Sequence, residues 1–275
     1  SAEAREMFFH ASDQATRHQL DRRTIKPDSG KHAAVTAGPA VVKIRCGIYA
    51  RAAYWDVLTK TQRYIHLLRS LQDQHPEWVF CMQSAAAAHG LPVPHVHMNR
   101  VHLATYSGTH GVRGDVARHR ITMREVTIAS NLRVTPLLLT GFDCARVFDF
   151  GHGLAICDAL LRRLGWSPKQ LVSAFQSIPG RHRQRQQALY AASHANALSE
   201  SAGESMARAA MIELGFAVPE LQVEVTRPLE PNRTYRIDFC WTLQDGSRVF
   251  GEFDGNVKYE DPRLLKGRSA ARVLA

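Results

Sequence analysis

Two strand-like segments near the end of the chain place carboxylates on one face of a hairpin, and this pattern constrains the fold more than any other. Residues 235–241 read Tyr-Arg-Ile-Asp-Phe-Cys-Trp, and residues 249–254 read Val-Phe-Gly-Glu-Phe-Asp. Both alternate apolar with polar or small side chains, as strands with one buried face do. One parity of pairing aligns the two apolar rows, and a three-residue loop over 244–246 gives it, with Gly246 at the left-handed position.

This register sets Asp238 opposite Glu252 and diagonal to Asp254. Like charges directly opposite each other destabilise a hairpin, so the arrangement predicts a compensating cation. Carboxylate oxygens are hard ligands that suit Mg²⁺ or Mn²⁺. The alternative is a solvated outer face whose acids pair with neighbouring cations such as Arg236 and Arg248. The spacing alone leaves both interpretations open.

A helix is predicted before the hairpin, opening at Ser201 and stopped by Gly215. Glu204 follows Ser201 at the spacing of a capping box, in which a glutamate side chain bonds the helix N-terminus. A helix followed by an antiparallel meander with acids on its inner strands also outlines an α+β nuclease core. Glu204 therefore has two candidate roles, one in capping and one in a site.

Charge and cysteine usage narrow the class of protein. The 275 residues include 35 Lys and Arg against 25 Asp and Glu, a net charge of +10 that favours polyanionic partners, with nucleic acid as the default. The five cysteines are widely spaced and form no Cys-x-x-Cys pair, so neither a disulfide framework nor a zinc ribbon is indicated. No apolar run reaches the length of a membrane span and no signal-peptide pattern opens the chain, so we expect a soluble cytoplasmic protein without a membrane partner.

The predicted fold class is α+β, and its first part, residues 1–75, is expected to be winged-helix-like. Residues 3–25 read as helical, and residues 40–49 alternate as one basic strand that ends in a glycine. Lys43 and Arg45 on that strand are candidate nucleic-acid contacts. The plain alternative is an α/β fragment that reads no DNA.

The second part, residues 76–195, is predicted to be mixed α/β, and the third, residues 196–275, to be the α+β nuclease core in outline. Short strands are expected between the first and later helices of the second part. Apolar periodicity and capping residues predict helices over 58–74, 84–89 and 143–164, and a further helix from Pro168 that is capped by Ser167. The helix over 58–74 belongs to the first part.

Histidines and a basic run in the second part suggest binding, although weakly. His95 and His97 are predicted to share a strand face, and three more histidines follow at positions 102, 110 and 119. A metal cluster is conceivable, but neutral or DNA-facing histidines are favoured, because neither His-x-x-x-His on a helix nor a carboxylate at ligand spacing is present. The run Arg-His-Arg-Gln-Arg-Gln offers Arg181, Arg183 and Arg185 as phosphate contacts, or else is a solvated connection.

The last quarter of the chain resembles the PD-(D/E)xK nuclease superfamily, and most closely its very-short-patch-repair endonuclease-like branch. The motifs are Gly-Glu-Ser at 203–205, Tyr-Arg-Ile-Asp-Phe at 235–239 and Gly-Glu-Phe-Asp-Gly at 251–255. The resemblance implies that acids at these motifs bind Mg²⁺, which activates a water and offsets charge on the scissile phosphate.

Carried over residue by residue, the resemblance makes Asp238 and Glu252 metal ligands. Asp254 occupies the third motif position as a further ligand, and Glu204 is the helix acid. Many active members have Lys where Asp254 stands; Lys258, four residues on, is the candidate for the missing cation. The resemblance also implies that residues 196–275 form a restriction-endonuclease-like α/β core, and we expect this part to lack the last helix and strand of such a core.

Residues from about 40 to 165 resemble the AbiEi-type antitoxins of type IV toxin-antitoxin systems. The matching stretches are Val-Lys-Ile-Arg-Cys-Gly-Ile-Tyr-Ala from residue 42, Ser-Ala-Ala-Ala-Ala-His-Gly-Leu-Pro from residue 84, and Arg-Val-Thr-Pro from residue 133 through Phe-Asp-Cys-Ala at 142–145. The resemblance implies a winged-helix transcriptional regulator with a second α/β domain, a recognition helix near residues 11–25 and a cognate toxin as partner.

Three functional hypotheses follow. The favoured one is a DNA-associated endonuclease that hydrolyses phosphodiester bonds with Mg²⁺ or Mn²⁺. The second is an AbiEi-like regulator or antitoxin whose nuclease-like domain is inactive. The third is a basic module that holds an acidic protein partner such as a toxin. The same acids would serve on DNA or RNA, and the residue pattern alone does not choose between them.

Overall fold

The computed structural model describes residues 8–10, 40–106, 110–121, 124–227 and 230–254. The chain forms an α+β fold of helices and small sheets, which confirms the predicted fold class. It divides into two units, the first made of residues 1–90 with 94–136 and the second of residues 137–275 with 91–93. These units do not coincide with the three parts 1–75, 76–195 and 196–275, and that division stays a prediction.

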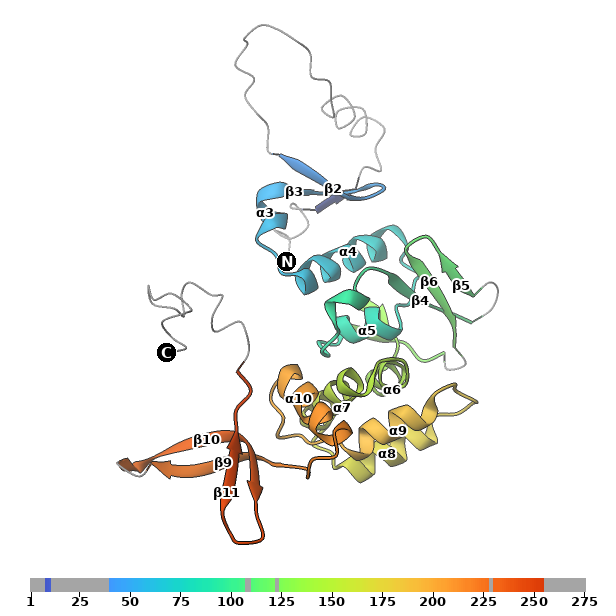
Figure 1. The fold of residues 1–275 in the computed structure, drawn as a ribbon. Coiled ribbons are helices and arrows are strands. Elements are labelled where there is room, and N and C mark those ends of the chain that lie inside the picture. Colours follow the sequence, from blue (N-terminus) through green and yellow to red (C-terminus); the bar gives the residue numbers. More distant parts are fainter. Residues whose placement is uncertain (1–7, 11–39, 107–109, 122–123, 228–229, 255–275) are drawn as a thin grey trace, which may run out of the picture. The chain divides into compact units, whose positions relative to one another are not determined.

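The first unit contains a small antiparallel sheet in the order β1-β3-β2 (Figure 1). Its strands are β1 (Phe8–His10), β2 (Val41–Arg45) and β3 (Ile48–Arg51). The prediction of one strand over 40–49 is wrong, because the chain reverses between β2 and β3 and the two pair with each other. Gly47 lies in this turn with a φ of 77°, a conformation that glycine adopts without strain.

Strand β1 corrects the predicted helix over residues 3–25. Phe8 pairs with Ala50 and Phe9 with Tyr49, so residues 8–10 extend the sheet along β3. Consecutive aromatic residues suit a strand that finds a partner edge better than a helix. The rest of that predicted helix, including the candidate recognition helix at 11–25, lies outside the described residues.

Three helices of the first unit follow the sheet: α3 (Ala52–Asp56), α4 (Lys60–Gln74) and α5 (Met82–Ala88). Helix α4 confirms the amphipathic helix predicted at 58–74. The hydroxyl of Thr59 accepts from the Gln62 amide and the Gln62 side chain accepts from the Thr59 amide, which is a complete capping box. Helix α5 is the expected alanine-rich helix, and all its residues are buried.

The short strands expected next are present. They are β4 (Val101–Thr105), β5 (Gly111–Arg113), β6 (Val116–Arg120), β7 (Thr127–Ala129) and β8 (Leu132–Val134). Strands β4 and β6 run parallel, while β5 pairs antiparallel with β6. The strand predicted for His95 and His97 is wrong, because these residues form a 3-10 turn, η1 (His95–His97), in which the His97 amide donates to the Pro94 carbonyl. Pro94, with its fixed φ, opens this turn.

Helices α6 to α10 form the body of the second unit. Their bounds are α6 (Leu137–Val147), α7 (Phe150–Leu164), α8 (Pro168–Ser177), α9 (Arg185–Ser193) and α10 (Ala202–Glu213). The segment predicted as helical from 143 begins earlier and is split between α6 and α7. Ser167 caps α8 with Pro168 in its first turn, as predicted, and Gly165 ends α7 with a φ of 66°.

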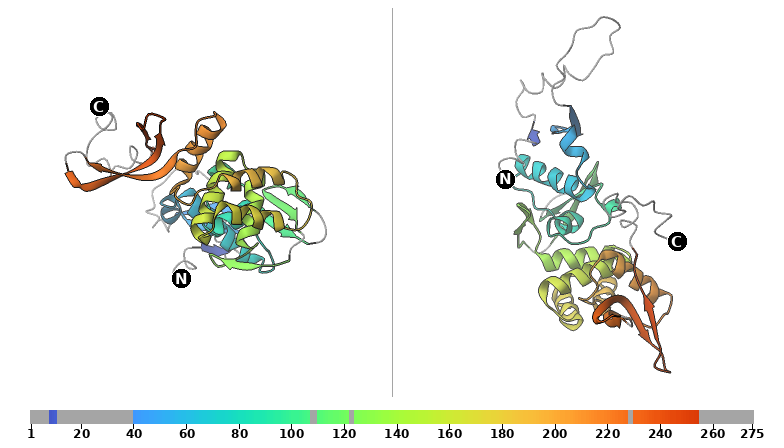
Figure 2. Two further views of the ribbon diagram at one scale, coloured as in Figure 1. Left: turned by 90° about the horizontal axis from the view of Figure 1, so that it is seen from below. Right: turned by 90° about the vertical axis from the view of Figure 1, so that its left-hand side faces the viewer.

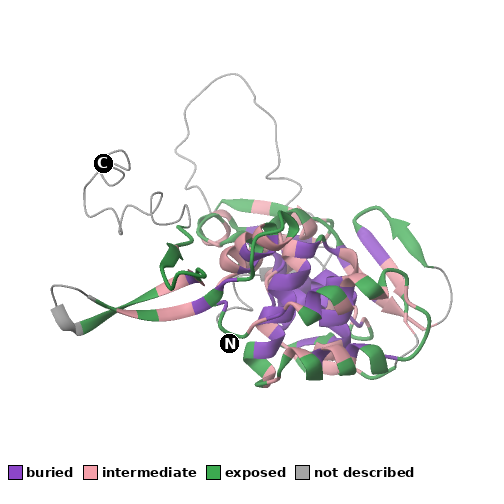
Figure 3. Cartoon of the chain, turned by 60° about the horizontal axis from the view of Figure 1, so that its bottom comes forward, coloured by how far each residue is buried: buried purple, intermediate pink, exposed green. Residues whose placement is uncertain are grey.

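The core of this unit lies between the helices, where Figure 3 shows most of its buried residues. Phe142, Leu154 and Phe175 have no exposed surface. Helices α6 and α7 approach closely at Gly141, where an added Cβ would lie 2.5 Å from a methyl carbon of Leu160. Of the helices in the described residues, none is both long enough and apolar enough for a membrane crossing.

An antiparallel sheet completes the second unit, in the order β11-β10-β9, with the long β10 pairing on both sides (Figures 1 and 2). Its strands are β9 (Glu220–Arg227), β10 (Glu230–Thr242) and β11 (Arg248–Gly251). The amide of Leu243 donates to the Ser247 carbonyl at 2.8 Å, and Gly246 has a φ of 83°. The predicted three-residue loop and its left-handed glycine are therefore confirmed.

Candidate active site

A row of polar side chains crosses one face of the β9-β10-β11 sheet. The pairs on either side of Gln222 in β9 place it opposite Asp238 in β10. Phe239 pairs with Gly251, so the next position along the hairpin sets Asp238 opposite Glu252, directly after β11. This confirms the register predicted from alternation and brings residues of three neighbouring strands into one line.

The carboxylate of Asp238 is fixed at both oxygens. It is half-buried, and its Oδ2 accepts from the Phe253 backbone amide at 2.9 Å while its Oδ1 accepts from Nε2 of Gln222 at 3.2 Å. The Phe253 amide lies between the candidate ligands Glu252 and Asp254. The segment after β11 is therefore held against Asp238.

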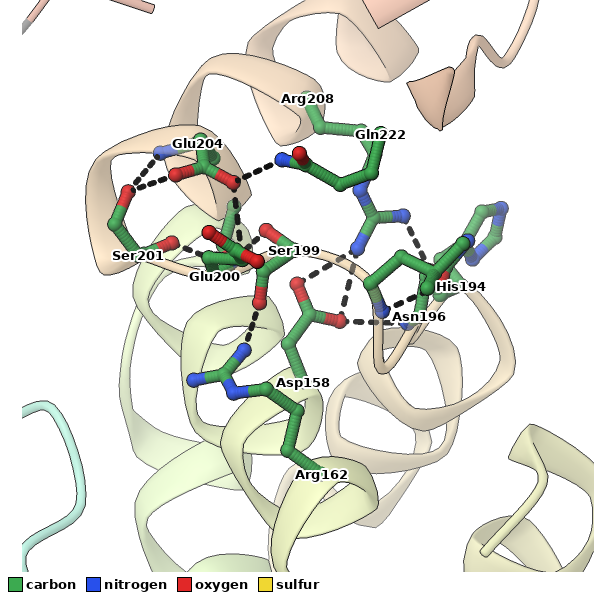
Figure 4. A network of polar contacts seen from close by, with 12 residues as sticks. Asp158, Arg162, His194, Asn196, Ser199, Glu200, Ser201, Glu204, Arg208 and Gln222 are labelled. Atoms are coloured by element: carbon green, nitrogen blue, oxygen red, sulfur yellow. Dashed lines mark hydrogen bonds and ion pairs between the residues drawn. The ribbon is translucent and has the colours of Figure 1, made fainter. Parts of the chain in front are cut away.

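Glu204 lies in the first turn of α10 and takes part in capping it (Figure 4). Ser201 accepts from the Glu204 amide at 3.1 Å and donates its hydroxyl to Glu204 Oε1 at 2.8 Å. Glu204 Oε2 accepts from the Glu200 amide at 2.8 Å, one residue before the usual capping-box partner. The same Oε2 also accepts from Nε2 of Gln222 at 3.2 Å. Glu204 is thus a capping residue that also faces the polar row.

Gly203 lets the segment after β11 pack on α10. A Cβ at Gly203 would lie 2.2 Å from Cε1 of Phe253, a distance that no side chain tolerates. The Phe253 ring therefore covers the first helical turn beside Glu204, and only glycine leaves room for it there. This contact holds the segment from Glu252 to Asp254 close to Glu204.

A buried ion pair anchors α10 one turn further along. Arg208 Nη2 donates to both carboxylate oxygens of Asp158 in α7, at 2.8 and 2.7 Å, and both side chains are essentially unexposed (Figure 4). Arg208 Nη1 donates to the His194 carbonyl, and the Asn196 amide donates to Asp158. Burial raises the pKa of Asp158, whereas the charge of Arg208 lowers it.

The donor chemistry of the polar row suits a hard cation. Glu204 and Asp238 converge on the Nε2 atom of Gln222, and Glu252 is exposed next to Asp238 in the register. Among the described residues, no three or more His, Cys, Asp or Glu side chains are grouped as a metal site would require. Mg²⁺ is commonly held by only one or two carboxylates together with waters and substrate phosphates, so the two converging acids fit it. Asp254 is exposed at the end of the described residues, and Lys258 lies outside them.

The predicted nucleic-acid contacts of the first unit lie on β2. Lys43 is exposed, and Arg45 forms an ion pair with Asp115 at 2.9 Å. An arginine in a partly exposed ion pair can exchange its carboxylate for a phosphate, so both residues stay candidates.

The basic run between α8 and α9 divides into two kinds of residue. Arg181 and Arg183 are exposed. Arg185 instead donates to the carbonyls of residues 175, 176, 178 and 180 at the end of α8, and its guanidinium lies 5.4 Å from the Phe142 ring centre. We therefore assign Arg185 a structural role in place of a phosphate contact.

Two of the histidines form a direct pair in the first unit. Nδ1 of His102 in β4 and Nε2 of His119 in β6 are 2.9 Å apart. Burial, followed by the nearby positive charge of His119 and Arg100, lowers the pKa of His102 to about 4. His102 is therefore neutral at neutral pH, in agreement with the favoured interpretation of these histidines.

Several residues that build the site were not identified from the sequence. Gln222 read as an ordinary strand residue, and Gly203 as part of a motif without a packing role. Asp158 gave the one available signal, because a lone acid among the apolar residues of α7 requires a buried partner. Its partner Arg208 read as an ordinary helix residue.

No family model matches this chain. Two uncharacterized proteins, from the CDC 1551 / Oshkosh and H37Rv strains of Mycobacterium tuberculosis, are each 29% identical to it over 168 residues. Each match covers 59% of this chain and 58% of the relative, so the chain spans well under two thirds of the length of these relatives. An activity therefore has to be inferred from the site itself.

Proposed function

We propose that the second unit is a nuclease that hydrolyses phosphodiester bonds of DNA with Mg²⁺ or Mn²⁺. The observation that carries this proposal is the convergence of a helix acid, Glu204, and a strand acid, Asp238, on one amide nitrogen, 3.2 Å from each. Glu252 continues the row from the adjacent strand end. A helix acid and a strand acid would not be expected to converge on one atom of an ordinary solvated sheet face.

Asp238 and Glu252 are the proposed metal ligands, with Asp254 as a further ligand at the third motif position. A bound Mg²⁺ would lower the pKa of a water and offset charge on the scissile phosphate. The Phe253 amide and the Gln222 side chain orient Asp238. Ser201 and the Glu200 amide orient Glu204 beside it. Preorganised groups of this kind lose little freedom when substrate binds.

Association with DNA is proposed from charge. The net charge of +10 supports it, and exposed Lys43, Arg181 and Arg183 offer phosphate contacts. We also propose a cytoplasmic location, which the five cysteines support because they are present as thiols, and thiols stay reduced there.

A second candidate function is an AbiEi-like regulator or antitoxin, with operator DNA and a cognate toxin as partners and an inactive nuclease-like domain. Both oxygens of Asp238 already accept hydrogen bonds from the protein, which favours this alternative. Asp254 stands where the resembling superfamily often has Lys, and its charge would add to that of the other acids.

Cleavage and binding assays on single- and double-stranded DNA test the two proposals. Wild type is expected to cut with Mg²⁺ or Mn²⁺ and not with EDTA, whereas Asp238→Asn and Glu252→Ala should each lose roughly 100-fold or more, because transition-state charge stabilisation worth several kcal/mol is lost. Glu213→Gln, which removes the same charge at the far end of α10, should cut normally. Tight binding to one preferred sequence without cutting in any metal would reject the nuclease and leave the regulator.

A further inference from the structure

The backbone of Gln222 has a conformation that strand residues do not normally adopt. It lies inside β9, yet its φ is 56°, the left-handed region that glutamine rarely adopts. The pairs Leu221–Phe239 and Val223–Ile237 keep the same register on either side of it. The unusual backbone is therefore confined to one residue, opposite Asp238, and such local conformations persist where the surroundings fix them, often at functional sites.

The side chain of Gln222 spans the two acids. Its Nε2 atom lies 3.2 Å from Glu204 Oε2 (Figure 4) and also 3.2 Å from Asp238 Oδ1. An amide group carries two N–H donors, one for each carboxylate, and ionised carboxylates only accept. The opposite amide orientation would set Oε1 against two carboxylate oxygens, so the hydrogen-bond network fixes the orientation.

The amide oxygen of Gln222 is left unsatisfied by this arrangement. Gln222 Oε1 is buried and has no hydrogen-bond partner. A buried acceptor without a donor is unfavourable, and a glutamine that served only the fold would be expected to satisfy it. The contacts of Nε2 with the two carboxylates outweigh that loss in this position.

We infer that Gln222 is a positioning residue that holds Glu204 and Asp238 towards one point, where together they face a divalent cation. This rests on the proposed nuclease function. Without the amide, the two like charges would repel each other and separate, because the amide is the hydrogen-bond donor that joins both carboxylates. Partners that orient ligands in this way commonly change metal affinity by roughly 10- to 100-fold when they are removed.

Mn²⁺ binding to the full chain, measured by electron paramagnetic resonance, tests this directly. Gln222→Leu removes the donor. Gln222→Asn keeps the amide and tolerates the left-handed backbone well, but it is one carbon too short to span both acids. We expect both variants to bind Mn²⁺ at least about tenfold more weakly than wild type. Gln176→Leu, at an exposed position in α8, makes the matched control and should bind normally.

Comparing the two Gln222 variants separates the effect of the hydrogen bonds to both acids from the effect of the left-handed backbone. Normal binding by Gln222→Asn with weak binding by Gln222→Leu would show that the left-handed backbone, and no bridge, is what matters. Normal binding by both would overturn the inference outright. DNA cleavage by the variants should fall through kcat or metal affinity, with KM for DNA unchanged.

Unfolding by urea in EDTA distinguishes this inference from the proposed function. Gln222→Leu should lower the urea midpoint more in the wild-type background than in the Asp238→Asn background, because the amide then has one fewer charge to hold. Additive shifts would overturn the role of Gln222. Wild type that neither binds Mn²⁺ nor cuts DNA, combined with non-additive shifts, would reject the nuclease while keeping Gln222 as the residue that joins the two acids.

Discussion

Replacing Arg208 by Met should destabilise the second unit strongly, and by an amount that depends on pH. Arg208 and Asp158 are 2% and 0% exposed at their side chains, so solvent does not screen either charge. The substitution removes both hydrogen bonds to Asp158 and the donor to the His194 carbonyl. Met has similar length and flexibility, so it limits the cavity that is left.

The magnitude follows from leaving a buried carboxylate without its partner. Breaking such a pair from one side costs about 3–5 kcal/mol. A domain typically unfolds with about 5–15 kcal/mol, so the variant would be marginally stable. Asp158→Asn in the same chain keeps an acceptor for the Asn196 amide and removes the stranded charge. The double variant should therefore recover a large part of the loss.

The pH dependence has a definite sign. Burial already raises the pKa of Asp158, and removing Arg208 takes away the charge that lowers it. A carboxyl whose pKa is higher in the folded than in the unfolded state is penalised when ionised, and the penalty fades as pH falls through the folded-state pKa. Urea unfolding followed by circular dichroism should show the full loss at about pH 8 and a smaller one at about pH 5.

Arg181→Met is the control, since Arg181 is exposed and the charge change is the same. It should shift stability by less than about 0.5 kcal/mol. A loss below about 1 kcal/mol for Arg208→Met, or an equal loss at both pH values, would refute the reasoning that an unpaired buried charge sets the cost.

Three further predictions concern the site and its surroundings. Gly203→Ala should leave the melting temperature nearly unchanged, because a gain in helix stability of up to about 1 kcal/mol offsets the displacement of the partly exposed Phe253 ring. DNA cleavage should nevertheless fall, because the segment after β11 moves with that ring. Unchanged cleavage would show that Phe253 does not contribute to the site. The pKa of His102 is lowered to about 4 from an ordinary 6.5, so the unfolded chain binds the proton more readily than the folded chain does. The free energy of unfolding of the first unit should therefore fall by up to about 3 kcal/mol as the pH falls from 6.5 to 4. His102→Phe should flatten this pH dependence in acid unfolding. Arg185→Ala should lower the free energy of unfolding by about 2 kcal/mol, because four hydrogen bonds to carbonyls are lost, and it should not weaken DNA binding. Arg183→Ala should instead lower the DNA affinity and its salt dependence in filter-binding assays and leave stability intact.

The acid hairpin was predictable because its determinants are local. Alternation over 235–241 and 249–254 selected the register, and Gly246 selected the loop, so the Asp238–Glu252 alignment needed no information from the rest of the chain. The α8 start was equally local, fixed by Ser167 and Pro168. The same kind of reasoning failed at 40–49, where Gly47 was taken as the end of a strand and is the turn between two.

What the sequence did not yield depends on contacts between distant segments. Gln222 looks like any polar residue of an alternating strand, and nothing nearby predicts its left-handed backbone. Its role appears only when α10 brings Glu204 over β9. Asp158 and Arg208 are likewise fifty positions apart, so periodicity places each on a helix but does not pair them. The buried surroundings of each group determine its partner.

The position of Glu204 is therefore a property of the helix packing as much as of its own sequence. Arg208 lies one helical turn after Glu204 and ties α10 to α7. Ser201 fixes the first turn, and the Phe253 ring on Gly203 sets how closely the sheet approaches. A helix that shifts by a fraction of an ångström at Arg208 carries Glu204 away from the Gln222 amide. Reaction geometry tolerates little displacement, so Arg208→Met should lose Mn²⁺ affinity and cleavage under conditions where most of the protein is still folded.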